Sequence, residues 1–180
     1  MQKNIYLMLP ILFAICATCS ASPYEHEFFV VNVPAGFKGP ITQNLQGAWS
    51  IAFSKPHLQS QNATLLQITY MDFGAKIPKL NEKELSEGAE KYLLQFLAGV
   101  ERRRTSFNKG SVQEVRISGI PGKKIEWAGN VPEAGISARG VMFCVIKGSR
   151  VFSFHTQDVT TFADKTLPVT IKAIESIRLK

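Results

Sequence analysis

The sequence has few of the residues on which most catalytic and metal sites depend. Only three histidines and three cysteines occur among 180 residues. No two of the histidines, His26, His57 and His155, have the spacing of metal ligands. The chain also lacks a Gly-x-Ser-x-Gly motif and a phosphate-binding glycine loop. We therefore expect no catalytic residues, no metal site and no cofactor.

Two of the histidines have sequence contexts that call for an interpretation. In Glu25-His26-Glu27 three candidate ligands are adjacent, but neighbouring strand residues point to opposite faces. An exposed, hydrated segment explains that triplet better than a metal site. His155 lies between Phe154 and Thr156 in a predicted strand, and we interpret it as a histidine whose hydrogen bonds are satisfied within the fold.

The first 21 residues have the order of a secretory signal peptide. Lys3 is the only charge, an apolar run over residues 5–17 follows, and small residues end the segment at Ala21. The run is shorter than the ~20 apolar residues that span a bilayer. We predict a cleaved signal over residues 1–21, a single domain over 22–180, and a periplasmic or secreted protein. Lipid attachment at Cys19 is the alternative, and only then is membrane contact expected.

After that cleavage Cys144 would be the sole cysteine, so an internal disulfide is excluded. It lies in the apolar run 141–146, which favours a buried and inert thiol over a nucleophile. The fold must then be stabilised by packing alone.

Alternating and continuous apolar segments predict an antiparallel sheet. Gly148-Ser149 joins the two clearest strands, and glycine at the first position of a two-residue loop suits a type II′ turn. The first of these strands is apolar on both faces, so both faces need cover. We expect an α+β fold, an α/β/α sandwich whose central, mostly antiparallel sheet is covered by helices on both faces. The predicted strands span residues 27–34, 48–53, 64–73, 112–117, 123–128, 136–147 and 150–156.

Two segments have helical periodicity. Residues 82–104 carry an apolar stripe that includes Phe96, and Asn81 with Glu84 forms a capping-box pattern at its start. A second helix is predicted within 161–176. Because Pro168 is tolerated in a first turn, its regular part is predicted to begin near Leu167.

The most visible charged feature is Arg102-Arg103-Arg104 at the end of the first predicted helix. Positive charge there complements the helix dipole, so a solvated helix end is one interpretation. The other is a binding surface for an acidic protein or an anionic lipid. The net charge of +7 permits acidic partners without indicating one. Nucleic-acid binding is not expected, since no run interleaves basic residues with exposed aromatics.

The order of elements, together with local sequence, resembles the PsbP-like superfamily. The matching stretches are residues 28–37, residues 119–127, the 140–154 hairpin and residues 173–177. The resemblance implies an α/β/α sandwich and a role as a protein-binding or assembly factor. It implies no catalytic residues, because no catalytic motif defines that superfamily.

We therefore expect an exported, non-enzymatic module that binds a protein partner or assists assembly, with Arg102, Arg103 and Arg104 as candidate contact residues. The alternative is a carrier of a small ligand or lipid in the cell envelope, because the Phe-rich strands could form a pocket beneath the long helix. An enzyme of unfamiliar type is a third hypothesis. A histidine in contact with a carboxylate in a deep cleft would support it.

Overall fold

The computed structural model describes residues 21–45, 47–58, 60–74 and 80–180. The predicted signal peptide, with Cys16 and Cys19, lies outside the described residues except for Ala21. The strands are β1 (Ser22–Glu25), β2 (Phe29–Val33), β3 (Lys38–Leu45), β4 (Ala48–Pro56), β5 (Ala63–Asp72), β6 (Thr105–Lys109), β7 (Gln113–Ile117), β8 (Ile120–Val131), β9 (Ile136–Lys147), β10 (Arg150–Val159) and β11 (Arg178–Leu179); the helices are α1 (Glu82–Glu101) and α2 (Thr160–Glu175).

The strands form one large and one small antiparallel sheet. The large sheet has the order β3-β4-β5-β10-β9-β8-β6, with β7 also paired to β8, and the small sheet has the order β1-β2-β11. Every strand pair among the described residues is antiparallel, so the prediction of a mostly antiparallel sheet is confirmed.

The β9–β10 hairpin forms the centre of the large sheet. Its turn has positive φ at Gly148 (57°) and not at Ser149, as a type II′ turn requires. The β7–β8 hairpin turns at Ser118 (φ 54°) and Gly119 (φ 77°), and two positive φ values in a row indicate type I′. This turn is shorter than the Ser118–Gly122 loop that the glycine and proline content predicts, because Pro121 and Gly122 already pair with β7.

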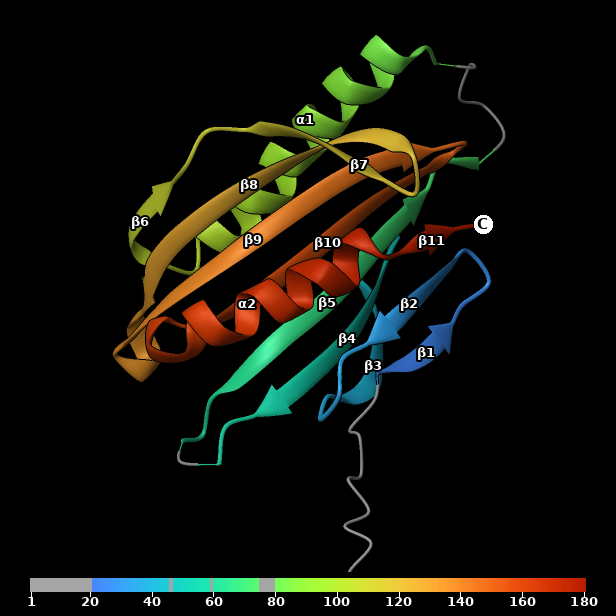
Figure 1. Cartoon of the computed structure of the whole chain (residues 1–180). Helices are drawn as coiled ribbons and strands as arrows, with labels where there is room; N and C mark the ends of the chain where they lie inside the picture. Colours follow the sequence, from blue (N-terminus) through green and yellow to red (C-terminus); the bar gives the residue numbers. More distant parts are fainter. Residues whose placement is uncertain (1–20, 46, 59, 75–79) are drawn as a thin grey trace, which may run out of the picture.

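The two faces of the large sheet are packed differently (Figure 1). Phe143 and Phe154 on one face pack with Ile174 of α2 and with the small sheet. Met142 and Cys144, at alternate positions of β9, pack on the other face with α1. Cys144 is fully buried, which confirms the prediction of a buried thiol, and burial raises its pKa.

The expected helical layers over both faces are seen only in part. One helix packs against each face, and the small sheet shares one face with α2. On the other face α1 packs mainly against β8 and β9. Among the described residues no helix covers β3 and β4 on that side. The pocket described below lies beside that gap, mainly over β5 and β10.

The structure differs from the sequence predictions in one helix boundary, one missed strand and the exposure of two aromatic side chains. The second helix begins at Thr160, with Pro168 in its interior, and not near Leu167. The strand β3 was not predicted, because its residues are all exposed and carry no apolar alternation. The two-residue period of residues 48–53 puts Trp49 on the same face as Ile51 and Phe53, which are buried, yet Trp49 is 42% exposed. Phe96 is only partly buried, whereas Leu93 and Leu97 of the same helix are buried.

The start of α1 agrees with its prediction. The Asn81 side chain accepts from the Glu84 backbone N–H at 3.0 Å, and Glu84 accepts from the Asn81 N–H at 2.8 Å.

In the described part of the chain, no helix is long and apolar enough to span a bilayer.

Candidate functional site

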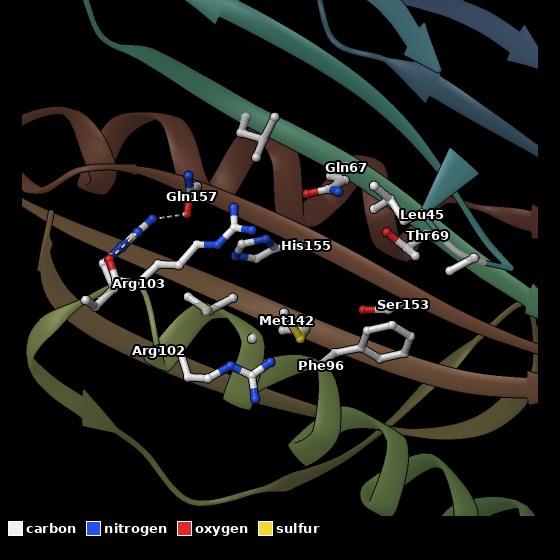
Figure 2. A pocket seen from close by; sticks show the side chains of 15 residues that line it. Leu45, Gln67, Thr69, Phe96, Arg102, Arg103, Met142, Ser153, His155 and Gln157 are labelled. Carbon is white, nitrogen blue, oxygen red and sulfur yellow. Dashed lines mark hydrogen bonds between the residues drawn. The ribbon is translucent and has the colours of Figure 1, made fainter. Parts of the chain in front are cut away.

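A pocket of about 550 Å³ lies between the C-terminal half of α1 and the strands β5, β9 and β10 (Figure 2). One wall is helical and the other is the sheet face that α1 leaves uncovered. Three arginines from the turn after α1 stand at one end. Its lining comprises Leu45, Ala48, Leu65, Gln67, Thr69, Phe96, Gly99, Val100, Arg102, Arg103, Arg104, Met142, Ser153, His155 and Gln157.

The polar floor of the pocket follows from the two-residue period of its strands. Gln67 and Thr69 alternate on β5 with Leu66 and Ile68, which are buried on the opposite face. On β10 the residues Ser153, His155 and Gln157 alternate in the same way with buried neighbours. The sheet therefore offers amide, hydroxyl and imidazole groups toward the pocket.

The three arginines lie in the turn that ends α1. The Arg102 N–H donates to Ala98 O at 3.2 Å, and the N–H groups of Arg103 and Arg104 donate to Val100 O and Glu101 O at 3.1 and 3.0 Å. The chain reverses there into β6, which brings all three side chains to the pocket. Among the described residues none of the three has a carboxylate within 4 Å.

Arg104 is the most enclosed of the three. Its Nη2 donates to Gln157 Oε1 at 3.2 Å and its Nη1 donates to the Arg103 carbonyl at 3.0 Å. The guanidinium lies 5.6 Å from the Trp127 ring centroid, within range of a cation–π contact. Its Nε is buried without a partner in the described part of the chain. Burial is the main cause of the lowered pKa of Arg104.

His155 is the buried titratable group of the floor. His155 is only 8% exposed. The centroid of its ring lies 5.7 Å from the centroid of the Trp127 ring. Burial, assisted by the charge of Arg104, lowers the pKa of His155 to about 4, so the imidazole is neutral at pH 7. Its Nε2 has no hydrogen-bond partner among the described residues. The interpretation of His155 as a satisfied strand histidine is therefore wrong.

A second histidine contacts a carboxylate elsewhere in the fold. His57 Nε2 lies 2.8 Å from Asp158 Oδ1, and the His57 ring stacks on Phe162 at 3.9 Å. Asp158 also accepts from Thr64 Oγ1 at 2.7 Å and from Thr166 Oγ1 at 2.6 Å. Because its oxygens are already occupied by these donors, and neither His57 nor Asp158 lines the pocket beside Arg104, we assign this cluster a structural role.

The remaining sequence candidates lie apart from the pocket. His26 stacks on Phe29 at 4.8 Å, and Glu25 pairs with Lys180 at 2.7 Å. No group of three potential metal ligands occurs among the described residues. The pocket brings together Arg102, Arg103 and Arg104, which the sequence singles out, with Gln67 and Gln157, which it does not. The signal that could have revealed Gln67 and Gln157 is the presence of polar residues at every second position of β5 and β10.

The arrangement is suited to holding an anion. Guanidinium groups bind carboxylates and phosphates through paired hydrogen bonds, and amide and hydroxyl groups add further donors. Ser153 and His155 stand two residues apart on one face of β10, and in the described structure no hydrogen bond joins them. A serine nucleophile would need that bond to its base.

No protein-family model and no curated protein sequence matches this chain. Solved structures do resemble it. Cyanobacterial PsbP (CyanoP) from Synechocystis sp. PCC 6803 superposes with a TM-score of 0.60 and 10% identity, covering 92% of this chain and 95% of that one.

Two further structures resemble the chain at similar levels. LpqN of Mycobacterium tuberculosis, described as involved in cell envelope biogenesis, has a TM-score of 0.53 and 12% identity, over 89% of this chain and 85% of its own. PA94 from Pseudomonas aeruginosa, a protein of unknown function, has a TM-score of 0.51 and 10% identity, over 87% and 95%. At these identities the likeness concerns the fold alone. The chain has the PsbP-like fold that its sequence resemblance implied.

Proposed function

We propose that this protein is an exported, non-enzymatic binding module whose pocket beside α1 holds a small ligand with an anionic group. This is the small-ligand alternative of the sequence hypotheses. One observation carries it: three arginines without carboxylate partners in the described structure line the same pocket as a buried histidine whose Nε2 has no hydrogen bond.

A partly buried guanidinium loses hydration, and within a protein that loss is usually offset by a carboxylate. Arg104 has only the neutral Gln157 side chain, a backbone carbonyl and the Trp127 ring as partners. An oxyanion from a ligand would supply the missing negative charge. The neutral imidazole of His155 can supply one further donor.

The proposed location is the periplasm or the cell exterior. Support comes from the signal-peptide pattern of residues 1–21. A fold shared with LpqN, which is described as acting in cell envelope biogenesis, agrees with that location. The pocket requires no cofactor for this role.

The proposal is tested by calorimetric titration of the purified protein with inorganic phosphate and with acetate. We expect saturable binding that weakens as salt is added, because ions screen the arginines. The double variant Arg102→Gln/Arg103→Gln changes only exposed side chains and should bind at least tenfold more weakly. Arg116→Gln, which removes an exposed arginine paired with Glu82, is the matched control. Equal affinity of the wild type and the double variant for these anions would refute the proposal. It would also be refuted if the wild-type protein bound neither phosphate nor acetate.

A second candidate function, protein binding, is favoured by the edge strand β3. All eight of its residues are exposed, and Ile41 is 59% exposed on it. An exposed edge can accept a strand from another protein. Crosslinking in an envelope extract should then give a defined adduct that Ile41→Lys abolishes and Arg102→Gln leaves intact. An adduct pattern unchanged by Ile41→Lys would exclude this surface.

A further inference from the structure

We propose that the ligand is an anionic amphiphile, with its charged group at the arginines and an apolar chain lying in the furrow between α1 and β5. This inference rests on the proposed function for the charged end. It adds the chemical class of the remainder of the ligand and a second part of the site.

The apolar part of the site is a second hollow of about 470 Å³. It shares Phe96 with the first pocket, and the same two elements, α1 and β5, form its walls. Leu65 of β5 and Phe73, which directly follows β5, mark the two ends of the furrow. At strand spacing these two residues are about 26 Å apart. The second hollow is lined by Met71, Phe73, Lys91, Tyr92, Gln95 and Phe96.

The two ends of the furrow differ in chemistry. The first carries the three arginines and His155, whereas aromatic and thioether side chains predominate in the second. Phe73 and Tyr92 lie there with ring centroids 5.7 Å apart, and Phe73 remains 44% exposed. An exposed large apolar side chain beside a hollow gains free energy when an apolar group covers it.

Charge along the furrow points to the same class of ligand. Among the described residues that line the two hollows none is acidic, and of these Lys91 is the charged residue at the apolar end. The charged side chains that line the furrow therefore attract a negatively charged group and repel a cationic one. Phe96 lines both hollows, so they adjoin at this side chain, and we infer that one molecule occupies both.

The first test measures affinity against chain length, using butyrate, octanoate and dodecanoate below their micellar concentrations. Each buried methylene should raise affinity by up to about fourfold, so dodecanoate should bind at least tenfold more tightly than octanoate. Dodecanol, which has the same chain without the charge, should bind at least tenfold more weakly than dodecanoate. Dodecyl phosphate in place of dodecanoate distinguishes a phosphate head from a carboxylate.

The second test uses variants at the apolar end. Phe73→Ser should weaken dodecanoate at least fivefold and leave butyrate and phosphate unchanged. Leu94→Ser, an equally exposed change on the outer side of α1, should alter neither. Phe73 is exposed, so its replacement leaves the buried core intact.

The outcomes separate this inference from the proposed function. If phosphate and butyrate bind but affinity does not rise with chain length, the amphiphile is refuted and anion binding stands. If dodecanol binds as tightly as dodecanoate, the anionic end of the amphiphile is refuted. If none of these probes binds, both proposals are refuted.

Discussion

The side chain of Arg104 is held by contacts that depend on a glycine in a neighbouring strand. Trp127 pairs in register with Gly140, and a Cβ at Gly140 would lie 2.5 Å from the indole ring. The ring can therefore lie flat over β9, where it meets both Arg104 and His155. At the residue scale the pocket is thus assembled by packing as well as by charge.

Because His155 is buried in its neutral form, we predict that the folded protein loses stability in acid. The pKa of this histidine is about 4 in the folded protein against 6.5 when exposed, so below pH 6.5 the unfolded chain binds a proton that the folded chain does not. The free energy of unfolding should then fall as pH decreases from 6.5 toward 4, by about 3 kcal/mol in total. Urea denaturation at a series of pH values measures this. His155→Gln cannot titrate and should show a shallower decline; an identical decline in both proteins would contradict the assignment.

At the element scale α1 has two functions, covering the sheet and forming a wall of the pocket. Leu93 and Leu97 face β8 and β9 and are buried, while Phe96 lies at the border of the stripe and lines the pocket. The sequence pattern shows all three on one stripe and cannot separate these positions, because a helical wheel contains no information about where the covered strands end.

Because Leu93 is buried and Phe96 is only partly buried, truncating them should lower the free energy of unfolding by different amounts. Leu93→Ala leaves a cavity in the core and should cost about 3 kcal/mol. Phe96→Ala should cost only about 1–2 kcal/mol, against the ~3–5 kcal/mol expected for a fully buried phenylalanine, and should weaken ligand binding. Urea denaturation and titration with dodecanoate measure the two effects. A larger loss of stability for Phe96→Ala than for Leu93→Ala would show that the stripe is buried throughout.

A polar cluster joins four elements at the opposite side of the sheet. Asp158 at the end of β10 accepts hydrogen bonds from His57 after β4, Thr64 in β5 and Thr166 in α2. Its side chain is fully buried. The cluster fixes the start of α2 relative to the sheet, a position that no helix-capping side chain secures.

Removal of that carboxylate should therefore be costly. Asp158→Ala leaves several buried donors without an acceptor and should lower the free energy of unfolding by about 3–5 kcal/mol. Asp164→Ala removes an exposed carboxylate paired with Arg139 and should cost about 1 kcal/mol or less. Thermal denaturation of both variants gives the comparison, and equal effects would show that the cluster is dispensable.

At the scale of the whole molecule, two apolar clusters on opposite faces of one sheet hold the fold together. The described part of the chain contains one cysteine, which is free, so no internal disulfide can form there. The sheet is wider than α1 on one side, and β5 and β10, beside the strands on which α1 mainly packs, form the floor of the pocket. The candidate site is thus a consequence of the mismatch between sheet width and helix number.

The sequence by itself determined the elements whose signals are local. The capping box at Asn81, the II′ turn at Gly148 and the buried run around Cys144 depend on neighbours within a few residues. It also indicated Arg102–Arg104 as a charged cluster. The exposed strand β3 was not predicted, because an edge strand without a buried face has no alternation of apolar residues.

Only the tertiary structure decided what the arginines face. Arg104 meets Trp127, His155 and Gln157, which lie between 23 and 53 residues farther along the chain and reach it through sheet pairing. Periodicity shows which face of a strand a side chain occupies, but not whether a helix covers that face. The choice between a solvated helix end and the wall of an arginine-lined pocket required the positions of α1, β5 and β10 in space, because it depends on contacts between residues distant in sequence.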